Sequence, residues 1–166
     1  MSYSSKAIAN LILDLDRDNG IRIDPMKLQK LVYISHGWNL AIHGKPLISD
    51  PIQAWQYGPV IPVLYHEFKN SGRSWITDHA TDVIVDEDTL DFHFVPARMD
   101  KKDSAVVDLV KIVLAKYGHL SGPQLSNLTH MHNTPWDKAY KFCPKTLISN
   151  EEIRTHFISL ASRSNG

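Results

Sequence analysis

Cysteine is nearly absent from this sequence, which also lacks a charge excess and a long apolar run. Cys143 is the only cysteine, so an internal disulfide is excluded. Lysine plus arginine total 18, and so do aspartate plus glutamate. This balance lacks the positive charge typical of domains that bind nucleic acid or membranes. Residues 1–6 lack the features of a signal peptide, and the apolar stretches are too short to span a membrane. We therefore expect a cytoplasmic protein that binds neither nucleic acid nor membranes.

Motifs that carry chemistry are missing as well. The glycines match neither a phosphate-binding loop nor a dinucleotide fingerprint, and no Gly-x-Ser-x-Gly elbow occurs. The nine histidines lack the spacing of metal ligands on a helix. His130 and His132 are two residues apart, and His66-Glu67 has no second histidine four residues after His66. We therefore predict no catalytic residues, no bound metal and no cofactor.

What the sequence does contain is an ordinary globular composition with strong helix signals. Hydrophobic residues make up 43% of the chain and charged residues 22%. A length of 166 residues suits one domain with one core. Apolar residues recur at helical spacing in most segments, preceded by Ser, Thr or Asp at positions suited to helix N-caps. We predict a mainly α fold of about six helices with a minor β element, in a single compact domain spanning residues 1–166.

The segment 24–43 is the strongest helix prediction. Asp24 suits the N-cap, and Pro25 suits the first helical position, where no N–H is needed. Apolar side chains cover more than one side of this helix, so we expect it to lie at the centre of the fold. The small residues Gly37 and Ala41 would let a neighbouring element approach closely. One face of this helix is predicted to comprise Leu28, Leu31, Val32, Ser35 and Ile42, and a second face carries Tyr33 and Leu40.

Two other segments carry strand patterns. Residues 52–56 predict a short strand, and Pro51 before it favours either an edge position or a place at the first residue of the strand over a central strand. Gly58-Pro59 marks a turn before the next helix. Residues 74–100 are acidic, and apolar residues alternate with polar ones near Phe92. This alternation favours a strand, either alone or as half of a small hairpin with an acidic turn at 86–88, and a solvated connection fits the composition equally well.

Three aromatic residues allow two interpretations. Trp55 and Tyr57 flank Gln56 just before the Gly-Pro turn, and Trp136 follows Pro135. Aromatic side chains with a polar tip are common anchors of protein interfaces, and they also fill corners of small cores. We favour the core interpretation, because the adjacent Gly-Pro suggests a built turn.

Several strings of residues resemble the Panacea domain family, also called SocA-like antitoxins. The first is Met26-Lys27-Leu28-Gln29-Lys30-Leu31-Val32-Tyr33, followed by Gly44-Lys45-Pro46-Leu47 and Ala54-Trp55-Gln56-Tyr57-Gly58-Pro59-Val60. The second block is Leu125-Ser126-Asn127-Leu128-Thr129-His130 with Pro135-Trp136. The similarity runs from residue 5 to about 160. Residues 76–101, a variable acidic connection, carry no motif of the family, so we expect specificity to differ there.

The resemblance implies a prokaryotic or phage-borne antitoxin domain, carried on a prophage or another mobile element, that neutralises a toxin through protein contact. The implied partner is a cognate toxin encoded by a neighbouring gene. Polar and aromatic residues of the quoted strings are the candidates for partner contact. They are Gln29, Lys30, Tyr33, Trp55, Tyr57, His130 and Trp136.

Three other functions remain open at the level of sequence. The protein could be an adaptor that delivers a bound protein to a protease. It could be a mobile-element enzyme with an unrecognised site, using Gln29, Tyr33 and His36. A DNA-binding repressor fits least well, because the helix expected after Gly118 offers no Lys or Arg for phosphates or bases.

Overall fold

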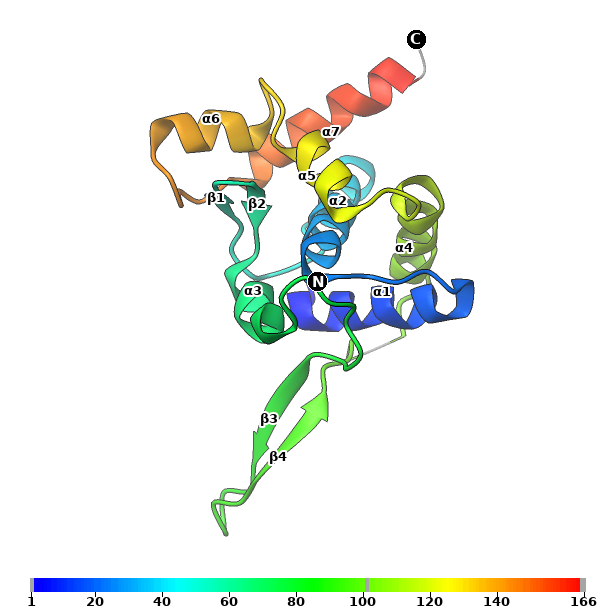
Figure 1. Ribbon diagram of the computed structural model, residues 1–166, viewed down its shortest axis with the longest axis vertical. Helices are drawn as coiled ribbons and strands as arrows, with labels where there is room; N and C mark the ends of the chain where they lie inside the picture. The colour runs from blue at the N-terminus through cyan, green and yellow to red at the C-terminus, as the bar shows by residue number, and fades with distance from the viewer. Residues whose placement is uncertain (1, 101, 165–166) are drawn as a thin grey trace.

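A computed structural model describes residues 2–100 and 102–164, and within these ranges the chain forms seven α-helices and two small antiparallel sheets (Figure 1). The mainly α class with a minor β element is confirmed, with one helix more than the expected six. The helices are α1 (Ser5–Asn19), α2 (Pro25–His43), α3 (Pro62–Phe68), α4 (Ser104–Tyr117), α5 (Gly122–Thr129), α6 (Pro135–Phe142) and α7 (Asn150–Ser164). The strands are β1 (Gln53–Trp55), β2 (Gly58–Val60), β3 (Thr81–Val85) and β4 (Phe92–Pro96), and a short 3-10 turn, η1 (Lys69–Ser71), follows α3.

The predicted helix boundaries rest on side-chain caps that the structure contains. The hydroxyl of Ser4 accepts a hydrogen bond from the N–H of Ala7 at the start of α1. The carboxylate of Asp24 does the same for Lys27 at the start of α2, with Pro25 at the first helical position. Gly44 ends α2 in the left-handed conformation. The predicted boundaries of α2 are therefore confirmed.

Helix α2 lies at the centre of the molecule, as the sequence predicts. It contacts α1, α3, α4, α5, α7 and strand β2, and 13 of its 19 residues are buried. On the face predicted from residues 28, 31, 32, 35 and 42, four residues are buried, whereas Ile42 is 60% exposed. Ile42 lies on the last turn of α2, where it lines a shallow surface hollow between α2 and α4 beside Ile112. Helical spacing alone does not show where the neighbouring helices stop.

The predicted close approach at Gly37 is made by α7. A Cβ atom on Gly37 would overlap the ring of Phe157, so the absence of a side chain lets α7 pack directly onto α2. The Phe157 ring meets Tyr33 and Trp38 edge-on, with ring centroids 6.1 and 5.2 Å away. Helix α7 therefore seals one side of the core.

The two sheets differ in how they are supported. Strand β1 pairs with β2 through a two-residue turn, and it also bonds to the segment before α7, because the N–H of Ala54 donates to the carbonyl of Thr146. Strand β2 was missed from the sequence, where Gly58-Pro59 indicated only a turn. Strands β3 and β4 form the hairpin that was one of the alternatives for residues 74–100, and it extends away from the helices (Figure 1).

Candidate partner-binding site

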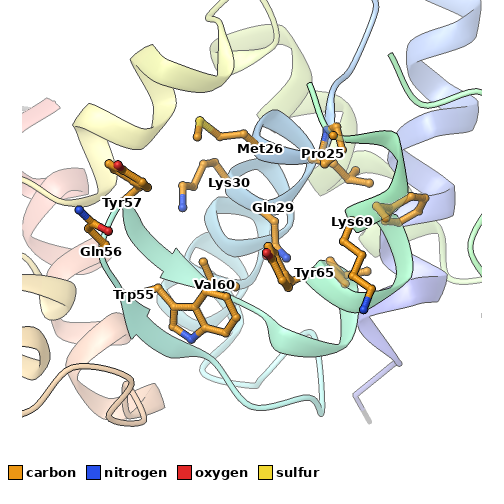
Figure 2. Close-up of a pocket in the computed structure, with 14 residues that line it drawn as sticks. Pro25, Met26, Gln29, Lys30, Trp55, Gln56, Tyr57, Val60, Tyr65 and Lys69 are labelled. Carbon is orange, nitrogen blue, oxygen red and sulfur yellow. The ribbon is translucent and has the colours of Figure 1, made fainter. Parts of the chain in front are cut away.

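An open pocket of about 460 Å³ lies between α2, the β1–β2 turn and α3 (Figure 2). Its size falls within the range of binding pockets in proteins. Figure 2 shows Trp55, Tyr57, Tyr65 and Lys69 around it, with Gln29 and Lys30 reaching in from α2. The full lining is Pro25, Met26, Leu28, Gln29, Lys30, Trp55, Gln56, Tyr57, Val60, Leu64, Tyr65, Phe68, Lys69 and Gly72.

The β1–β2 turn places an aromatic ring at the edge of the pocket. Trp55 pairs with Gly58, so Gln56 and Tyr57 form the turn, and Tyr57 is 62% exposed. Gly58 has a φ of +116°, a conformation that favours glycine. A Cβ atom there would also come within 3.1 Å of the Lys30 Nζ and 3.3 Å of the Thr129 Oγ1. Glycine is therefore required both by the backbone and by the packing under the turn.

One wall of the pocket is an aromatic pair. The rings of Trp55 and Tyr65 meet edge-on with centroids 4.9 Å apart, and Tyr65 is exposed. The Nζ of Lys145 lies 5.3 Å from the Trp55 ring centroid, a cation–π contact. The Trp55 indole N–H donates to the Gln53 side chain at 2.8 Å, which fixes the ring. The wall is thus held in place before any partner binds.

Gln29 and Lys30 are held from beneath the pocket by backbone groups of the next segment. The Gln29 amide donates to the Ile61 carbonyl and accepts from the Ile61 N–H, both at 2.9 Å, which ties α2 to the start of α3. Lys30 is only 2% exposed, and its amine donates to the Pro59 carbonyl at 2.8 Å. Burial lowers the pKa of Lys30 to about 7, because the charged amine loses contact with water.

The structure brings together four of the seven candidate residues from the sequence: Gln29, Lys30, Trp55 and Tyr57 all line the pocket. Tyr33 is buried against α7, outside the pocket lining, and burial raises its pKa. His130 and Trp136 also lie outside the pocket lining, with ring centroids 5.3 Å apart. These last three candidates remain predictions without a place in this pocket.

The choice between core and interface for the aromatics has a different answer at each position. Trp136 is buried, and its indole N–H donates to the carbonyl of Trp55 at 2.6 Å, so the core interpretation is confirmed there. The core interpretation was wrong for Tyr57, because the turn residue of a two-residue hairpin projects outward. Trp55 is intermediate, with one side packed and one side on the pocket.

Sequence reasoning missed Tyr65, Lys69 and Met26 as pocket residues. Tyr65 occupies a non-core position of α3, between Leu64 and Phe68, which are both buried. Helical spacing places this aromatic residue off the apolar face of α3, and that position was a usable signal in the sequence. Lys69 follows the last residue of α3, and no pattern in the sequence marks it.

The three residues considered for an enzyme do not share a cleft. His36 is buried, with its Nδ1 accepting from the N–H groups of Leu47 and Ile48 and its Nε2 bonded to Asn150. Burial lowers its pKa. Each ring nitrogen thus serves the packing of neighbouring segments.

In residues 2–100 and 102–164, no three His, Cys, Asp or Glu side chains gather as metal ligands would. None of the helices in these ranges has the length and apolarity of a membrane span.

The family model described as "Antitoxin SocA-like, Panacea domain" matches residues 28–137. The chain belongs to this family. It is also 34% identical over 137 residues to Antitoxin SocA of Caulobacter vibrioides (strain NA1000 / CB15N), covering 82% of this chain and 70% of the relative. No solved structure matches it significantly.

Three of the strings that resemble the Panacea family meet at the pocket. The string from Met26 contributes the α2 side, and the string from Ala54 forms β1, the turn and β2. The string at 125–130 lies on α5 and supports the turn from behind, where the Ser126 hydroxyl donates to the Tyr57 carbonyl at 2.5 Å. These three motifs thus form much of the pocket and its support, whereas Gly44-Lys45-Pro46-Leu47 lies outside the pocket lining.

Proposed function

We propose that this chain is an antitoxin that holds a toxin from a neighbouring gene in a direct complex, with residues 1–166 acting as one unit in the cytoplasm. Membership of the SocA-like family supports the antitoxin role. The pocket beside Tyr57 supports direct binding, because its exposed aromatic rings are preorganised and face solvent. Such rings are typical anchors of protein interfaces.

The chemistry of the pocket indicates what the toxin would insert. The lining is mostly apolar, and among the lining residues the structure describes there are two lysines, Lys30 and Lys69, and no acid. An apolar or aromatic side chain next to a carboxylate fits this combination. A carboxylate would stabilise the charged form of the buried Lys30 amine, because it replaces the interactions with water that the amine loses on burial.

The affinity required of a neutralising complex is consistent with a few such anchors. A nanomolar dissociation constant corresponds to about 12 kcal/mol of binding free energy. Hot-spot residues typically contribute 2 kcal/mol or more each when truncated, and tyrosine and tryptophan are over-represented among them. Tyr57, Tyr65 and Trp55 are therefore the expected hot spots.

Co-expression tests the proposal directly. The adjacent reading frame is induced with or without this chain, growth is followed, and the two proteins are co-purified. We expect wild-type rescue with a stable complex, and loss of both on combining Tyr57→Ala with Tyr65→Ala. Ile112→Ala is the matched control, because Ile112 is an exposed apolar residue on α4, which packs on α2 away from β1–β2 (Figure 1). Rescue without a complex would contradict direct binding and favour the protease adaptor or an enzyme.

A further inference from the structure

The β3–β4 hairpin carries one face that is apolar except for Thr81 at its base. Val83 lies opposite Phe94 and Val85 opposite Phe92. Side chains of directly opposed residues point to the same face, and so do those two apart on one strand. All four are between 52% and 64% exposed, and the two phenylalanine rings meet edge-on. We call this projecting hairpin, residues 81–96, the arm (Figure 1).

The direction of the arm is fixed at its base. The buried Asn10 of α1 accepts from the Ala80 N–H and donates to the carbonyls of Ala80 and Ala97, at 2.8 to 2.9 Å. Glu67 of α3 accepts from the Thr81 N–H at 2.8 Å. Two-stranded hairpins are marginally stable without packing, and exposed apolar strands invite association. Because the arm is anchored and its apolar face is exposed, we expect another molecule to cover this face in the functional state.

The charge of the arm selects the kind of surface that covers it. Between Arg73 and Arg98 the sequence has no lysine or arginine. Five carboxylates lie within the arm: Asp82, Asp86, Glu87, Asp88 and Asp91. A partner surface rich in lysine and arginine would complement this charge, whereas an acidic or neutral surface would not.

A second copy of this chain fits poorly. Four side chains of this size, each about half exposed, present on the order of 400 Å², so two stacked faces bury about 800 Å². Stable interfaces bury about 1,200 Å² or more, and two arms would also bring ten carboxylates together. A larger, oppositely charged partner meets both conditions.

We propose that the arm is a second docking element for the toxin, seated on an apolar strip flanked by lysine and arginine side chains. This rests on the proposed function and adds a second contact of opposite charge to the pocket. Helix α3 connects the two, because Tyr65 and Lys69 border the pocket while Glu67 holds the arm. A single toxin that contacts both would therefore span α3.

The test measures association and dissociation rates of the purified chain with the product of the adjacent reading frame, at several salt concentrations. The triple change Asp86→Asn, Glu87→Gln and Asp88→Asn should slow association about tenfold at low salt, with a smaller effect at high salt. Its control, Asp18→Asn with Asp108→Asn and Glu151→Gln, alters net charge equally at exposed sites elsewhere and should change association less than twofold. Phe92→Ser should speed dissociation at least tenfold.

Hydrogen exchange on the wild-type protein provides a second test, which does not depend on whether Phe92→Ser also destabilises the hairpin. In the wild-type complex, amides of residues 81–96 should exchange more slowly than in the isolated chain. The arm proposal would be overturned if the arm variants had unchanged association and dissociation rates and if the amides of residues 81–96 stayed unprotected in a complex that still depends on Tyr57. The proposed binding at the pocket would then still stand. The absence of any complex would overturn both. A dimer of this chain that Phe92→Ser abolishes would contradict the choice of partner.

Discussion

Replacing the buried lysine of the pocket should stabilise the protein, most strongly at low and neutral pH. Lys30 has an ordinary pKa of 10.5, which burial lowers to about 7 in the folded chain. Between these values the unfolded chain holds a proton that the folded chain does not, so wild-type stability rises with pH across that window. Below pH 7 the full cost of the buried charge is present. At 1.36 kcal/mol per unit of pKa, the gap between the folded and unfolded pKa values of Lys30 corresponds to a loss of stability of at most about 5 kcal/mol.

Lys30→Met removes this cost while keeping the shape of the side chain. It also removes the donor to the Pro59 carbonyl, a loss of about 1 kcal/mol. We therefore expect the variant to be about 2–4 kcal/mol more stable than wild type at pH 6, with the gain shrinking steadily towards pH 10. Urea unfolding at pH 6, 7, 8.5 and 10 measures this difference.

Lys69→Met is the matched control, because Lys69 lines the same pocket but is exposed. Its stability should stay within about 0.5 kcal/mol of wild type at every pH. A Lys30→Met variant that is less stable at pH 6, or whose gain does not depend on pH, would refute the assignment of a buried, poorly solvated amine. The stabilised variant should also bind the toxin less tightly, if the amine meets a carboxylate.

Three further changes probe the fold. Leu31→Asp places an unpaired charge in the core and should abolish soluble expression, and a soluble variant with cooperative melting would refute the central position of α2. Gly37→Ala should lower stability by about 1–3 kcal/mol in denaturant unfolding, because its Cβ overlaps Phe157, and an unchanged midpoint would contradict this packing. Asn10→Ala leaves backbone groups of Ala80 without their partner, so we expect faster amide exchange at residues 80–97 and a loss of about 2–4 kcal/mol. Protection equal to wild type would refute the anchor.

The helices were predictable because their signals are local. The caps at Ser4 and Asp24, together with apolar spacing, fix where α1 and α2 begin. The β3–β4 hairpin was only partly predictable, because alternation and an acidic turn favoured a strand while a solvated connection fitted equally well. Its exposure was not predictable, because alternation predicts a strand without showing whether another element covers it.

The pocket was only partly predictable, because it forms between segments distant in sequence. Gln29 and Tyr57 meet there through the pairing of β1 with β2, and a two-residue turn without Asn or a first-position Gly gave no clear hairpin signal. The burial of Lys30 was equally hidden, since lysine on a helix is ordinarily solvated. Resemblance to the family supplied those positions where physical patterns did not.

A calorimetric titration of the purified chain into the product of the adjacent reading frame tests the central claim most directly. The account predicts a saturable complex with a dissociation constant in the nanomolar range, weakened at least about 30-fold by Tyr57→Ala and unchanged by Ile112→Ala. Because Tyr57 is exposed in the isolated chain, its truncation should leave the melting temperature near that of wild type. No detectable binding, or equal affinity for wild type and Tyr57→Ala, would contradict it.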